Sequence, residues 1–177
     1  MSTLTSTSRS LTRRLQAAFT LVEMLLVIAI ISILASLVIS SFSDAAQTSR
    51  EVVVRQQLAV CQSALNNWVN GRLGKVDTVI ESSGSPVTLD SLRKYYTTTL
   101  GSKTARWALI SGLNLDGSSA GDGYLDPMTA QHFLEMASKS GTPANMDKIK
   151  SDAMIQTGRW LELPAWSDGG VPTVELH

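Results

Sequence analysis

The chain has 177 residues, of which 44% are hydrophobic and 17% charged, with zero formal net charge, two histidines and one cysteine. This length suits one modest globular domain with an appendage. A single cysteine excludes an intramolecular disulfide, and so few cysteines and histidines argue against a Cys/His zinc site. Because lysines and arginines are not clustered, we expect no nucleic acid partner.

The N-terminal segment joins a basic stretch to a long apolar one. Residues 1–18 contain three arginines and no acid, whereas residues 19–42 contain a single charge, Glu23. About 20 apolar residues span the hydrocarbon core of a bilayer, so residues 19–42 predict a transmembrane helix. The basic flank predicts that the N-terminus stays in the cytoplasm and the C-terminal part crosses the membrane.

Three processing alternatives fit an apolar segment in this position. It is a secretory signal peptide cut near Ala46, an uncleaved anchor, or a leader cut between Ala18 and Phe19. Glu23 distinguishes them, because an unpaired carboxylate in lipid is costly and such residues usually have a function. A signal peptide or simple anchor has no use for it. In a helical assembly, Glu23 can neutralise the new α-amino group at Phe19 of a neighbouring subunit.

Residues 13–42 resemble the class III signal of type IV pilins and type II secretion pseudopilins. The resemblance lies in the run Phe-Thr-Leu-Val-Glu at residues 19–23, followed by the long apolar segment. It implies cleavage before Phe19 by a prepilin peptidase, methylation of the new terminus, and a role for Glu23 in subunit registry. The sequence departs from the family at Ala18, where Gly is usual, and at Ser40, where Pro is frequent.

The resemblance also implies a function and a location. We expect a structural subunit of a type II secretion pseudopilus or a type IV pilus-like filament, inserted in the bacterial inner membrane with its head outside the cytoplasm. Expected partners are copies of itself, other pilin-like subunits, the prepilin peptidase, the inner-membrane assembly platform and membrane lipid. A short head without cysteine pairs favours the pseudopilus. The alternatives are a membrane-anchored binding module that does not polymerise and, third, a soluble secreted enzyme.

An amphipathic helix is expected to continue from the apolar segment. Apolar residues recur at steps of four and three from Val54 to Trp68, which places them on one helix face. Cys61 belongs to this stripe, and we interpret it as a buried packing thiol. A single helix from about residue 20 to about residue 70 would be about 75 Å long.

The predicted fold class is α+β, with this long helix packed on a small antiparallel sheet. We expect a leader at 1–18, a stalk helix at 19–72 and a globular head at 73–177. Within the head, helices are predicted at 88–100, with Asp90 as N-cap, and at 128–138. Strands are predicted at 75–82, 106–113 and 158–166.

One loop of the head has the composition of a calcium site. Calcium takes six to eight oxygen ligands on a flexible loop, and residues 113–127 are rich in Asp and Gly. An EF-hand is excluded, because Leu125 stands where the loop needs Glu. The alternative is an ordinary Asp/Gly turn. The candidate ligands are Asn114, Asp116, Ser118, Asp122 and Asp126.

The sequence contains no motif of a common enzyme class. It has no G-x-S-x-G, no phosphate-binding glycine loop and no H-E-x-x-H. The two histidines, His132 and His177, offer no recognisable nucleophile–base pair. We therefore expect no enzyme, and we interpret the tryptophans at 68, 107, 160 and 166 as core residues.

Overall fold

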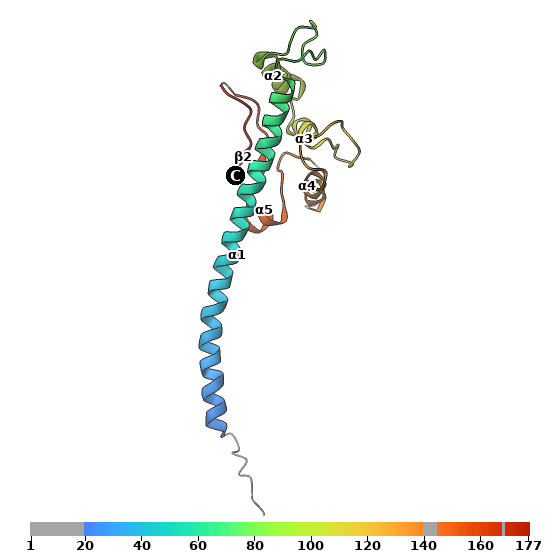
Figure 1. The fold of residues 1–177 in the computed structure, drawn as a ribbon. Helices are drawn as coiled ribbons and strands as arrows, with labels where there is room; N and C mark the ends of the chain where they lie inside the picture. Colours follow the sequence, from blue (N-terminus) through green and yellow to red (C-terminus); the bar gives the residue numbers. More distant parts are fainter. Residues whose placement is uncertain (1–19, 140–144, 168) are drawn as a thin grey trace, which may run out of the picture. The chain divides into compact units, whose positions relative to one another are not determined.

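The computed structural model describes residues 20–139, 145–167 and 169–177. It contains a long N-terminal helix, several short helices and one two-stranded antiparallel sheet, which confirms the α+β class (Figure 1). The elements in chain order are α1 (Leu21–Arg72), α2 (Leu89–Lys94), η1 (Tyr95–Thr99), α3 (Lys103–Ser111), α4 (Pro127–Lys139), α5 (Asp152–Thr157), β1 (Leu161–Glu162) and β2 (Glu175–Leu176).

The chain divides into two compact units, Met1–Ser43 and Asp44–His177, and the boundary between them falls inside α1. Helix α1 is uninterrupted because it contains no proline, and its only glycine, Gly71, lies in its last turn. Gly74, just beyond the helix, takes a positive φ of 76°. The helix therefore ends close to the predicted position.

In the second unit, α1 buries the predicted apolar stripe. Val54, Cys61, Leu65 and Trp68 are buried, and Leu58 packs against them. Fully burying a side chain of this size contributes roughly 1.5–3 kcal/mol. The stripe thus attaches the C-terminal half of α1 to the head. Burial also raises the pKa of the Cys61 thiol to about 12, in agreement with a packing role.

Aromatic side chains form much of the head core. The Tyr96 ring lies 5.6 Å from that of Trp68 and 6.1 Å from that of Trp166. Trp107 of α3 meets Phe133 of α4 edge to face at 6.0 Å. Such pairs add to the free energy of burial. The core interpretation is therefore confirmed for the tryptophans at 68, 107 and 166, all of which are buried.

The strand predicted at residues 106–113 is wrong, because this segment forms most of α3. Ser102 caps the helix by accepting from the Ala105 amide at 3.0 Å, and Gly112 ends it with a φ of 70°. Trp107, Ile110 and Ser111 are buried. Their spacing of three and four follows the helical repeat and not the two-residue repeat of a strand.

The sheet of the head is smaller than expected. β1 and β2 pair Leu161 with Leu176 and Glu162 with Glu175, so only a short part of the strand predicted at 158–166 forms. The strand predicted at 75–82 is wrong. That segment consists mainly of turns, with one isolated antiparallel bridge from Val76 to Pro86.

Both predicted head helices are present. α4 agrees with the helix predicted at 128–138, and α2 with η1 fills the segment 88–100. The predicted N-cap, Asp90, is wrong. Thr88 begins α2 through a capping box with Ser91, in which each side chain accepts from the backbone amide of the other residue.

Candidate functional site

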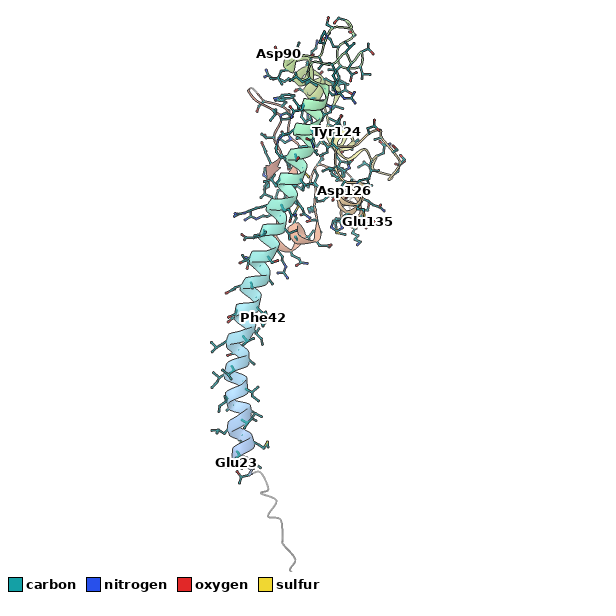
Figure 2. All side chains as sticks on the ribbon, in the orientation of Figure 1. Glu23, Phe42, Asp90, Tyr124, Asp126 and Glu135 are labelled. Atoms are coloured by element: carbon teal, nitrogen blue, oxygen red, sulfur yellow. The ribbon has the colours of Figure 1, made fainter. Side chains whose placement is uncertain are left out.

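Glu23 lies in the first turn of α1 (Figure 2). Its carboxylate is hydrogen-bonded to Thr20 at the start of the helix. One carboxylate oxygen accepts from the Thr20 amide at 2.8 Å and from its hydroxyl at 3.0 Å. In return, the Glu23 amide donates to the Thr20 hydroxyl at 3.2 Å. This is a capping box, which satisfies amides that the first helical turn otherwise leaves unpaired.

The helix beyond Glu23 presents apolar side chains on every side (Figure 2). Among the described residues, α1 is the one helix long and apolar enough to cross a membrane by length and composition. None of the described residues buries the apolar window of this helix. Between residues 21 and 42 the exposed large hydrophobic residues are Leu21, Val22, Met24, Leu25, Leu26, Val27, Ile28, Ile30, Ile31, Ile33, Leu34, Leu37, Val38, Ile39 and Phe42.

Three serines fall every fourth position along this apolar segment. Ser32 donates to the Ile28 carbonyl at 2.6 Å, and Ser36 and Ser40 donate in the same manner to carbonyls of the preceding turn. Their hydroxyls are thus satisfied by the helix itself, which allows serine in lipid. Their small size also permits close approach of a second helix.

Two predicted site residues, Ala18 and Phe19, lie outside the described residues. Thr20 is a site residue that the sequence analysis did not single out. The signal was present, because Thr-x-x-Glu before an apolar run is the sequence pattern of a capping box. Glu23 therefore has a hydrogen-bonding partner within its own chain.

The Asp/Gly loop is closed at its neck by two glycines. Gly112 has a φ of 70°, and a Cβ placed on it would lie 2.7 Å from the Gly123 nitrogen. A Cβ on Gly123 would lie 2.4 Å from the Ser111 oxygen, so both positions need glycine. Within the loop, the Asn114 amide donates to the Ser118 carbonyl at 2.9 Å.

Four of the five candidate calcium ligands in this loop are engaged in local hydrogen bonds. Asp116 accepts from the Ser118 amide at 2.9 Å and from its hydroxyl, and these bonds lower the pKa of Asp116. The Asn114 side-chain amide donates to the Ser118 hydroxyl at 3.0 Å. Asp126 accepts from the Thr129 amide in the first turn of α4. Asp122 is exposed.

In the described ranges, no group of three or more His, Cys, Asp or Glu side chains is placed to share a metal ion. Asn114 and Ser118 would contribute only neutral oxygens beside such side chains. The calcium hypothesis therefore stays a prediction.

Trp160 differs from the other three tryptophans because it is half-buried. Its ring is stacked on His177 at 5.6 Å, and the Lys148 ammonium lies 4.1 Å from the ring centroid. Its indole N–H donates to Glu162 at 3.1 Å. With these contacts, Trp160 packs against the surface of the head and does not stand free as a stacking platform.

The comparisons with known proteins bear on the N-terminal site. Residues 13–39 match the family model described as the prokaryotic N-terminal methylation motif. The predicted prepilin-type motif is therefore confirmed, and it supports a type IV pilin-like substrate of prepilin peptidase. Neither the curated proteins nor the solved structures gave a significant match. The motif and the apolar helix together fit a protein anchored in the inner membrane.

Proposed function

We propose that this chain is a structural subunit of a type II secretion pseudopilus or a type IV pilus-like filament. The observation that supports it is the methylation motif at residues 13–39, which overlaps the start of a helix whose apolar side chains no described residue covers. Such a helix needs either lipid or other helices around it. A subunit moves between the two, from the bilayer to a filament core.

In this proposal, prepilin peptidase cuts between Ala18 and Phe19, and the new α-amino group is methylated. Within a bilayer, the Glu23 carboxylate keeps its bonds to Thr20, which reduce the cost of burying it. During assembly, the ammonium at Phe19 of an adjacent subunit pairs with Glu23. This ion pair sets the register between neighbouring helices, while apolar and serine side chains pack around it.

The head takes no catalytic part in this proposal. It is displayed outside the cytoplasm, where other pilin-like subunits and the assembly platform meet it. A pseudopilus is favoured over an adhesive pilus because the head is short and has no cysteine pair. Loss of the chain would then block export of folded proteins and leave surface pili intact.

The first experiment determines the N-terminal residue of the protein extracted from membranes, by intact mass and terminal peptide mass. A mature chain that begins at methylated Phe19 is expected. A chain that keeps Met1 would contradict the proposal and favour the anchored binding module. Two open grooves of about 740 and 550 Å³ beside Leu115 would then be the first surfaces to test for a ligand.

The second experiment compares Glu23→Ala with Asp44→Ala, a matched control that removes an acid of α1 just beyond the apolar segment. Both variants are expected to be processed normally. Glu23→Ala is expected to abolish filaments sheared from cells, whereas Asp44→Ala keeps them. Normal filament yield from Glu23→Ala would exclude the registry role.

A further inference from the structure

Residues 169–177, named here the C-terminal strap, lead from two glycines to strand β2. Gly169 and Gly170 have φ values of 85° and 74°, a backbone region that favours glycine. No atom lies within 4 Å of a Cβ placed on either of them, so their backbone conformation, and not a lack of space for a side chain, favours glycine at both positions. The strap therefore begins at a pair of residues with unusual conformational freedom.

The middle of the strap is held by one side chain of α1. The Gln62 side-chain oxygen accepts from the Val174 amide at 2.8 Å, and its nitrogen donates to the Pro172 carbonyl at 2.9 Å. The Gln62 amide thus pairs with the strap as a peptide group of an adjacent strand would. The same nitrogen also donates to Asn66 at 3.0 Å, which fixes its orientation.

The far end of the strap is held by backbone bonds to Trp160 and by the stacking of the His177 ring on the Trp160 ring. The His177 amide donates to the Trp160 carbonyl at 3.0 Å, and the Trp160 amide donates to the His177 carbonyl at 3.2 Å. The pairing with β1 covers only two residues on each strand. This end is attached to β1 and the residue before it and not to α1, so Gln62 and Trp160 hold the strap at two separate places.

The strap contributes little to the hydrophobic core. Pro172 and Val174 are buried and Leu176 is partly buried, while the remaining strap residues are exposed. By contrast, α4 buries Ala130, Phe133, Leu134, Met136 and Ala137. Segments with few buried apolar contacts and a few hydrogen bonds open at lower free energy than the global unit.

From these contacts we propose that the strap opens and closes as a unit of its own while the rest of the head stays folded, and that Gln62 is its latch. Opening exposes the Gln62 amide and the edge of β1. The inference does not depend on the filament proposal, because every contact that supports it lies within one chain.

The experiment is residue-resolved amide hydrogen exchange on the full chain in detergent, comparing wild type, Gln62→Met and Gln57→Met. Methionine keeps the length of glutamine and removes its hydrogen bonds. Gln57 is the matched control, because it lies on the same helix and accepts from Ser151 at 2.7 Å, outside the strap. The informative amide is that of His177, whose bond to Trp160 neither substitution touches.

In Gln62→Met, the His177 amide is expected to exchange about tenfold faster, the equivalent of one to two lost hydrogen bonds. The amides of α4 keep their wild-type rates, and Gln57→Met leaves the strap unchanged. Acceleration at Val174 alone would overturn the latch, because the effect would then be local. If Gln62→Met fails to fold, the wild-type protein alone tests the proposal. The exchange rates of the strap amides and of the α4 amides are then measured at several denaturant concentrations. Strap amides with the same denaturant dependence as those of α4 would exchange only through global unfolding and would overturn the proposal.

Discussion

The carboxylate of Glu23 accepts two hydrogen bonds from Thr20, one from its amide at 2.8 Å and one from its hydroxyl at 3.0 Å. The charge that the proposed filament uses between subunits is therefore already hydrogen-bonded within one chain. The ion pair between subunits therefore has to compete with Thr20 for the Glu23 carboxylate, so a stronger capping box makes assembly less favourable.

Substitutions of Thr20 test whether its hydroxyl competes with filament assembly for Glu23. Thr20→Val keeps the shape of the side chain and removes both hydroxyl bonds, at a cost of about 1 kcal/mol in helix capping. Thr20→Ser keeps the hydroxyl. Because the valine variant frees the Glu23 carboxylate from a competing donor, we expect increased filament yield from it and wild-type yield from the serine variant. Both are measured on cells in which intact mass shows complete processing. Equal yields would show that the hydroxyl has no part in assembly.

Arg106 should be a major source of head stability. It is 4% exposed, donates to the Leu163 carbonyl at 3.0 Å and to the Gly101 carbonyl at 3.3 Å, and lies over the Tyr96 ring. Arg106→Met removes the partner of the buried Leu163 carbonyl, so we expect a loss of about 2–4 kcal/mol in the free energy of unfolding. Urea unfolding monitored by tryptophan fluorescence measures it.

The control for that measurement is Arg55→Met, which changes an exposed arginine of α1. It should alter stability by no more than about 0.5 kcal/mol. A similar loss from both variants would mean that the buried carbonyl bonds of Arg106 are not the cause.

Head stability should fall at alkaline pH. Burial raises the pKa of Cys61 from 9.0 to about 12 and that of Tyr96 from 10.0 to about 12. The stabilisation from keeping each group neutral is complete below its unfolded pKa and is lost as the pH rises toward 12. Between pH 8 and pH 10.5, Cys61 alone should cost about 2 kcal/mol.

Urea titrations at several pH values check this expectation through the slope of stability against pH. Cys61→Ala and Tyr96→Phe should each flatten that slope, whatever they do to stability at pH 8. If the free energy of unfolding depends on pH in both variants as it does in wild type, groups other than Cys61 and Tyr96 cause the loss of stability at alkaline pH.

The calcium hypothesis predicts that millimolar Ca²⁺ raises the melting temperature of the head, because ligand binds the folded state alone. Asp122→Asn, in an exposed side chain of the loop, should abolish the rise if the ion binds there. Asp90→Asn, on α2, is the control. Melting curves that do not respond to Ca²⁺ would leave the loop as a turn closed by Gly112 and Gly123.

Several elements could be predicted from the sequence because their signals extend over many residues. The apolar segment and the stripe from Val54 to Trp68 specify α1, since no proline or early glycine interrupts them. Glu23 could be found because a lone charge in an apolar segment is conspicuous. Thr20, its partner, was missed because a threonine beside that segment is unremarkable until the capping pattern is considered.

The head was harder to predict because its elements are short and its contacts distant in sequence. The apolar run at 106–113 reads equally well as a strand, and only Ser102 and Gly112 at its ends indicate helix α3. α5 was missed for the same reason, as its limits are set by Ser151 and Gly158. The hydrogen bonds of Gln62 join residues 110 or more positions apart, and no local sequence pattern predicts them.

The burial of Cys61 has a practical consequence for anyone who maps the neighbours of this chain. A thiol that is fully inaccessible, and the only one in the sequence, does not compete for maleimides or form stray disulfides. Single cysteines can therefore be introduced into the wild-type chain at exposed positions of α1 or the head and labelled selectively. Cross-links between such positions would report distances between adjacent copies without first removing a native residue.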